Sequence, residues 1–101
     1  MSDISQARTA LVTRILEGAG KASPSDRRAA FNNSGLTQPL RTLVDKVAIH
    51  AYTVAEEDIN AAKSGLSEDQ IFEIVVCAAV GQATRQYDTA LAALEAATGR
   101  E

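Results

Sequence analysis

Apolar residues recur every three or four positions along most of the chain, the spacing that places side chains on one face of an α-helix. The first such run is expected to begin near Ser2 or Asp3 and to end before Gly18. Its apolar face consists of Ile4, Ala7, Leu11, Ile15 and Leu16. The stretch from Gly18 to Ala22 has the composition of a linker. Residues 1–22 are therefore predicted to form an N-terminal helical arm, and residues 23–101 a single helical domain.

Three shorter helices follow, each with its own start and stop signals. They are expected from Ser23 to about Asn33, from Thr37 to about Tyr52, and from Thr53 to just before Gly65. Ser23 followed by Pro24 is typical of a helix start, and Gly35 is expected to close that helix. The segment Thr53 to Glu56 fits a capping box for the fourth helix. With no alternating strand pattern anywhere, the sequence predicts an all-α protein.

The last helix is the longest, and it indicates that the chain assembles with copies of itself. Ser67 and Gln70 form a capping box, and helical sequence continues to about Ala97. Such a helix is about 45 Å long, whereas a compact domain of this size is roughly 35 Å across. Residues 71–80 are apolar around the whole circumference apart from Glu73, so they need cover on all sides. Either the helix breaks near Gly81, or neighbouring subunits of a homo-oligomer cover it.

Two stripes run along the second half of this helix. One is an expected core stripe of Val80, Ala83, Tyr87, Leu91 and Leu94, and the other is a polar stripe of Gln82, Arg85, Gln86 and Thr89. The polar stripe has three interpretations: a chemical site, a solvated face or a polar subunit interface.

Composition excludes several classes of function. The net charge is −3 and the Lys and Arg residues are scattered, so nucleic acid is not an expected partner. The longest apolar stretch, Ile74 to Gly81, is far shorter than the roughly 20 residues of a membrane span. The N-terminus lacks the features of a leader peptide, so a cytoplasmic location is expected. One cysteine and one histidine cannot build a zinc site, and neither a metal nor another cofactor is expected.

Three titratable residues invite separate interpretations. Glu73 is the one charge between Ile71 and Gly81, so it is either a functional carboxylate or a surface glutamate. His50 falls at a helix end, beside Tyr52 in the sequence, where a histidine acts as an acid or base or simply as a capping residue. Cys77 fits best as a small hydrophobic residue of the core.

From about Pro39 onward, the chain resembles the alkylhydroperoxidase D-like and carboxymuconolactone decarboxylase family. The resemblance is clearest in LSEDQIFEIVVCAAVGQATRQYDTALAAL, residues 66–94. It implies an alkylhydroperoxidase D-like helical bundle with a long C-terminal core helix. It also implies a homo-oligomer, most often a trimer or hexamer.

The redox chemistry of that family is not carried over. Its redox-active members have a glutamate, then a Cys-x-x-Cys pair, then a histidine. Glu73 and Tyr87 fit the pattern, but the two cysteine positions fall at Arg85 and Asp88, and the histidine position falls at Ala92. Arg85 and Asp88 are one helical turn apart. Together they are either a site for a small anionic ligand or a weak ion pair.

Three hypotheses of function follow. The first is non-redox binding or transformation of a small, anionic molecule at an inter-subunit pocket. Glu73 and His50 would be its catalytic residues, and its ligand-binding residues would be Arg85, Tyr87, Asp88 and Gln82. The second is a non-catalytic oligomer with a structural or interaction role. The third and weakest is a single-cysteine peroxidase that uses Cys77, which has no cationic neighbour in sequence to activate it.

Overall fold

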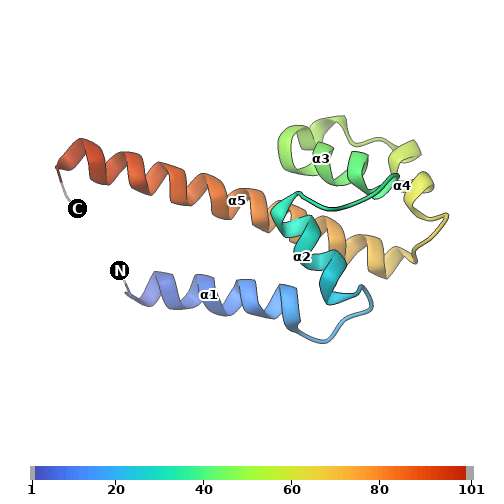
Figure 1. Ribbon diagram of the computed structural model, residues 1–101, viewed down its shortest axis with the longest axis horizontal. Coiled ribbons are helices and arrows are strands. Elements are labelled where there is room, and N and C mark those ends of the chain that lie inside the picture. The colour runs from blue at the N-terminus through green and yellow to red at the C-terminus, as the bar shows by residue number, and fades with distance from the viewer. Residues whose placement is uncertain (1, 100–101) are drawn as a thin grey trace.

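The computed structural model describes residues 2–99 of the chain and the side chains of residues 6–99. Over residues 2–99 the chain forms helices and loops and contains no strand (Figure 1). The elements are α1 (Ser2–Glu17), α2 (Pro24–Asn32), α3 (Leu40–His50), the 3₁₀ turn η1 (Ala51–Thr53), α4 (Glu56–Ala62) and α5 (Glu68–Thr98). The predicted all-α class is confirmed.

Helix α2 starts and ends about where its sequence predicts, but a different residue closes it. The Ser23 Oγ accepts a hydrogen bond from the backbone N–H of Asp26 at 3.0 Å, and Pro24 is the first helical residue. The residue that closes the helix is Asn33, with a left-handed φ of 51°, and not Gly35. Asparagine tolerates this conformation better than most residues. The backbone N–H of Ser34 then bonds the Ala29 carbonyl at 3.0 Å, which satisfies a free helix end.

The N-cap of α4 is Ala55, two residues after Thr53, where the predicted capping box begins. Residues 51–53 form η1, and the backbone N–H of Ala55 donates to Asp58 Oδ2 at 2.8 Å. The same Oδ2 accepts from Lys46 Nζ at 2.9 Å, so this carboxylate both caps α4 and ties it to α3. The Lys46 ammonium and the Ala55 N–H hold the pKa of Asp58 below its ordinary value. The contact with Lys46, twelve residues earlier, leaves no pattern in the sequence around Asp58.

Helix α5 is continuous from Glu68 to Thr98 and passes Gly81 without a break. Its predicted capping box is present. The backbone N–H of Ser67 donates to Gln70 Oε1 at 2.8 Å, and the Gln70 N–H donates to Ser67 Oγ at 3.2 Å. Gly99, with a φ of 75°, ends the helix where the sequence predicts.

The core surrounds the first half of α5. Its largest fully buried side chains are Leu43 and Val44 of α3 and Ile74 and Cys77 of α5. Leu16 of α1 and Ala30 of α2 belong to the same buried cluster as Ile74, so α1 packs on the body of its own chain. Cys77 is only 1% exposed, as expected for a core residue.

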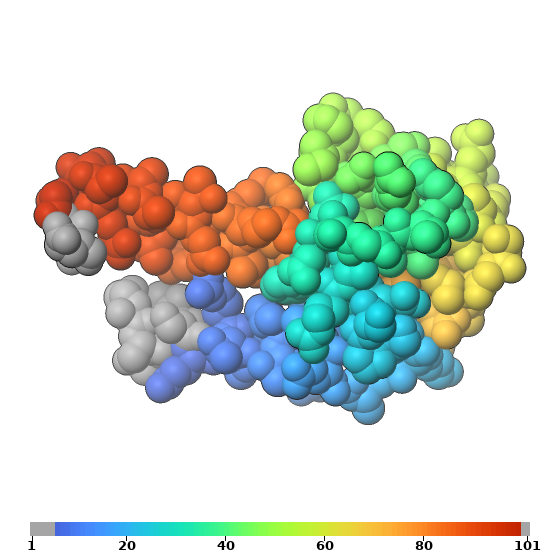
Figure 2. Space-filling view, viewed as in Figure 1, coloured from blue at the N-terminus to red at the C-terminus, as the bar shows by residue number. Residues whose placement is uncertain are grey.

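The second half of α5 extends away from this body. It is the red and orange rod of Figure 2, with part of α1 below it. All residues from 86 to 99 are exposed. The expected core stripe is therefore open in the single chain, where Leu94 is 60% exposed and Tyr87 is 44% exposed. From Ala83 onward the prediction that this stripe is core was wrong for one chain, because its residues there are exposed.

Candidate functional site

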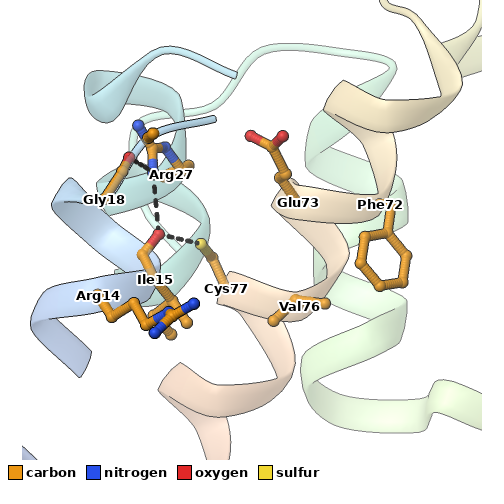
Figure 3. Close-up of a pocket in the computed structure, with 9 residues that line it drawn as sticks. Arg14, Ile15, Gly18, Arg27, Phe72, Glu73, Val76 and Cys77 are labelled. Carbon is orange, nitrogen blue, oxygen red and sulfur yellow. Dashed lines mark hydrogen bonds between the residues drawn. The ribbon is translucent and has the colours of Figure 1, made fainter. Parts of the chain in front are cut away.

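A cluster of charged groups lies where the end of α1 and the start of α2 meet α5. A pocket of about 430 Å³ opens there (Figure 3). Its lining residues are Arg14, Ile15, Gly18, Ala19, Arg27, Phe72, Glu73, Val76 and Cys77. Three elements contribute to one cavity, and two arginines, a carboxylate and a thiol line it.

Arg27 is the buried cation of this pocket, with 5% of its surface exposed. Its Nη1 donates to the backbone carbonyls of Gly18 at 2.8 Å and Ile15 at 3.3 Å, so it holds the end of α1. Its buried Nε has no hydrogen-bond partner. Among the described side chains, no carboxylate lies within ion-pair distance of this guanidinium. The charge of Arg27 is therefore only partly satisfied by the protein.

Glu73 faces Arg27 across the pocket but bonds to the loop between α1 and α2. The Lys21 N–H donates to both carboxylate oxygens, at 3.0 and 2.9 Å, and the Ala22 N–H donates to Oε1 at 2.8 Å. These backbone donors, helped by the Arg27 charge, hold the pKa of Glu73 below its ordinary value. A Cβ on Gly20 would lie 2.7 Å from Oε1, so a side chain at this position would force the carboxylate to shift. Glu73 fixes the loop and stays ionised.

Cys77 lies at the inner wall of the pocket, one helical turn after Glu73. Its Sγ donates to the Ile15 carbonyl at 3.5 Å. Burial raises the pKa of the thiol, the nearby Glu73 charge raises it further, and Arg27 opposes them only in part. The thiol therefore stays protonated, which is the opposite of what a reactive cysteine needs.

Two of the predicted ligand-binding residues join α5 to α2. Arg85 Nη1 donates to the Phe31 carbonyl at 2.6 Å, and its Nη2 donates to Gln82 Oε1 at 3.0 Å. The Phe31 carbonyl belongs to the last turn of α2, where carbonyls lack helical partners. Arg85, oriented by Gln82, thus caps the C-terminal end of α2.

The other two predicted ligand-binding residues, Tyr87 and Asp88, contact α1. Arg8 forms an ion pair with Asp88, and its guanidinium lies 5.4 Å from the centroid of the Tyr87 ring. Both contacts lie on exposed side chains, and such pairs contribute little stability each. Tyr87 and Asp88 therefore guide α1 along α5.

His50 stands apart from all of these residues. It is exposed at the end of α3, with its ring centroid 5.8 Å from that of Tyr52. It borders a shallow hollow together with Thr42, Asp45, Lys46 and Ile49. Within one chain, the six predicted site residues thus occupy separate places: Gln82 with Arg85, Tyr87 with Asp88, Glu73 at the pocket, and His50 alone.

Sequence reasoning overlooked Arg27 and Arg14, the two cations of the pocket. Arg27 precedes Ala30 by three residues and therefore shares its helix face, and Ala30 is fully buried. An arginine on the buried face of a short helix is the signal that could have revealed it. Arg14 carries no such signal, because it lines the pocket but is exposed on α1.

Comparison with known proteins adds no relatives. No family model, curated protein or solved structure matches the chain. Among residues 2–99, no helix combines the length and the apolar character that a bilayer crossing requires. The same range brings no three His, Cys, Asp or Glu side chains together in a way that could hold a metal ion.

Proposed function

We propose that this protein binds a small anionic molecule in the pocket between α1, α2 and α5, without redox chemistry. The observation that carries this proposal is Arg27, a guanidinium buried at the pocket with no carboxylate partner among the described residues. A buried charge is costly unless it is paired. An anion in the cavity would supply the missing partner.

The other charged groups of the pocket favour the same class of ligand. The carboxylate of Glu73 is already satisfied by three bonds from the backbone N–H groups of Lys21 and Ala22. Arg14 lines the cavity from α1 and adds a second positive charge. Guanidinium groups bind carboxylates and phosphates through paired N–H donors.

The apolar lining and the volume narrow the ligand further. Ile15, Phe72 and Val76 contribute apolar surface, and about 430 Å³ lies within the usual range for small-molecule sites. A carboxylate that carries a small apolar group fits both features. Because the pKa of Glu73 is lowered, that residue is a weak base, so the pocket favours binding over proton transfer.

Calorimetric titration tests the proposal. Benzoate is the probe, and benzyl alcohol is its uncharged analogue. We expect wild-type protein to bind benzoate, and Arg14→Met to weaken that binding about tenfold because one cation is lost. Arg28→Met is the matched control, because Arg28 is exposed, pairs with Glu17 and does not line the pocket. Equal affinity for benzoate and benzyl alcohol, or equal loss in both variants, would contradict an anion site.

Membership of the carboxymuconolactone decarboxylase-like family remains part of the proposal. It is supported by the helical fold and by the long C-terminal helix, which carries Glu73 in its first half. A second candidate function is assembly alone, in a homo-oligomer with a structural role. The observation that favours it is the open apolar surface on α5, where Phe72 is 69% exposed.

A further inference from the structure

One face of α5 is apolar over most of its length and is largely exposed in the single chain. We call it the open stripe, and it consists of Phe72, Val76, Ala79, Ala83, Tyr87, Ala90 and Leu94. Its six steps of three or four residues average about 3.7, so it stays on one side of a straight helix. It is about 33 Å long at 1.5 Å per residue. None of its residues carries a charge at neutral pH.

Among the described residues, Arg8 of α1 lies against the Tyr87 ring at the edge of this face, and most of the face stays exposed. Ile74, Ala78 and Gly81 are buried on the core side of α5, and Asp88 meets α1. On the open stripe, Phe72 is 69% and Leu94 is 60% exposed, and Val76 is half-buried. Continuous apolar faces of this kind on a soluble chain mark interaction surfaces.

The stripe and its helix share the same midpoint. Ala83 is the fifteenth residue after Glu68 and the fifteenth before Thr98, so it halves α5. It is also eleven residues from both Phe72 and Leu94. Arg85 still bonds to α2, and the residues from 86 onward project from the body (Figure 2). The projecting half is therefore somewhat shorter than the embedded half.

We infer that a second copy of this chain covers the open stripe, with the two α5 helices antiparallel about a twofold axis at Ala83. This register sets the projecting half of each copy against the embedded half of the other. Phe72 then meets Leu94 of the second copy, and Val76 meets its Ala90. The small side chains of Ala79 and Ala83 let the two helices approach closely at the axis. A twofold contact uses the same surface on both copies, which a stripe symmetric about its centre provides.

The pairing also closes the pocket. Phe72 and Val76 line the cavity as well as the open stripe. Leu94 and Ala90 of the second copy would therefore lie at the pocket edge and add apolar surface to it. This consequence rests on the proposed function, whereas the pairing itself does not.

Light scattering coupled to size exclusion tests the pairing with the full-length chain. We expect a mass of twice 10.6 kDa, or an even multiple of it if pairs assemble further. Ala83→Glu should halve the mass of the pair because it sets two carboxylates against each other at the axis. Ala92→Glu is the matched control. Ala92 is exposed and lies nine residues on, which is two and a half turns and hence the opposite face. Circular dichroism checks that both variants remain helical.

Disulfide formation tests the register. With Ala83→Cys, the two new thiols meet at the axis and should form a covalent dimer on mild oxidation. With Phe72→Cys they lie far apart in the antiparallel pair and should not. The native Cys77 is buried, and the wild-type chain serves as the blank.

Three outcomes would overturn the inference: a wild-type monomer or trimer, an unchanged mass for Ala83→Glu, or a covalent dimer from both cysteine variants, which would indicate parallel helices. None of these readouts involves a ligand. A pair that forms but does not bind benzoate would overturn only the pocket, and benzoate binding by a monomer would overturn only the pairing.

Discussion

At the scale of single residues, the charged groups around the pocket bond mainly to backbone atoms. Arg27 donates to two carbonyls at the end of α1, and Glu73 accepts from two N–H groups of the following loop. The same α1–α2 connection is thus held from one side by a cation and from the other by an anion. Both side chains belong to the fold as well as to the pocket.

Replacing Glu73 by Gln should destabilise the protein in a pH-dependent way. The pKa of Glu73 in the folded state is below its ordinary value of 4.5, so the ionised carboxylate stabilises the fold above that pH. This stabilisation is lost as the pH falls through the folded pKa. We expect Glu73→Gln to cost about 1 kcal/mol at pH 7, and the difference from wild type to shrink below pH 4.5.

Urea unfolding at pH 7, 5 and 3.5 measures this difference. Asp69→Asn is the control on the same helix, because its ion pair with Lys21 is exposed and should be worth less than about 0.5 kcal/mol. A cost of Glu73→Gln that is the same at all three pH values would contradict the carboxylate role.

Cys77 should behave as an inert core thiol. Burial raises its pKa above the ordinary value of 9.0, so little thiolate exists near neutral pH. We expect a disulfide reagent to modify the folded protein roughly a hundredfold more slowly than the urea-unfolded chain. Wild type and Cys77→Ser should consume hydrogen peroxide equally slowly. Faster consumption by wild type would revive the single-cysteine peroxidase.

At the scale of helices, the contact between α2 and α5 depends on one glycine and one arginine. A Cβ at Gly81 would overlap the backbone of Phe31, and Arg85 bonds the carbonyl of that same residue. Gly81 allows the backbones of the two helices to come into contact. Arg85 then donates a hydrogen bond to the Phe31 carbonyl, which lies in the last turn of α2. Gln82 and Arg85 of the polar stripe therefore serve first to join helices.

Gly81→Ala should destabilise the protein by about 2–3 kcal/mol, because the new methyl group must push α2 away from α5. The gain in helix propensity, at most about 1 kcal/mol, does not offset this. Gly65→Ala is the control, since nothing lies within 4 Å of a Cβ there, and it should be neutral or slightly stabilising. Denaturant unfolding compares the two variants, and equal effects would argue against the backbone contact.

Most of the helices could be predicted from the sequence because their signals are local. Ser23 and Ser67 cap the helices that follow them, and Gly99 ends α5, each through contacts within a few residues. The candidate site could not be predicted in this way. Glu73 and Lys21 are 52 residues apart, and Arg85 and Phe31 are 54 apart. A capping role that depends on such distant partners leaves no pattern in the adjoining residues.

At the scale of the whole molecule, the body and the projecting half of α5 differ in their support. The chain measures 50 × 29 × 20 Å, and the long dimension follows α5 (Figure 1). An isolated helical segment of this length is marginal in water, because its stability normally comes from packing. The projecting half therefore depends on α1 alongside it and, in our inference, on a second copy.

If the chains pair, thermal stability should depend on protein concentration. Folding is then linked to association, and each tenfold increase in concentration should raise the Tm by roughly 3–6 °C. Differential scanning calorimetry between 5 and about 500 μM chain would measure this over two such steps. The Ala83→Glu variant should lose most of the dependence. A wild-type Tm that is constant over this range would contradict the pairing.

Phe72 and Val76 belong to two surfaces at once, the pocket and the open stripe. In the paired protein, occupancy of the pocket and association of the chains would share those two side chains and would become thermodynamically linked. If the second copy raises the affinity of the pocket for the ligand by some factor, the ligand raises the affinity between the two copies by the same factor. The amount of anion present would then set the balance between separate and paired chains.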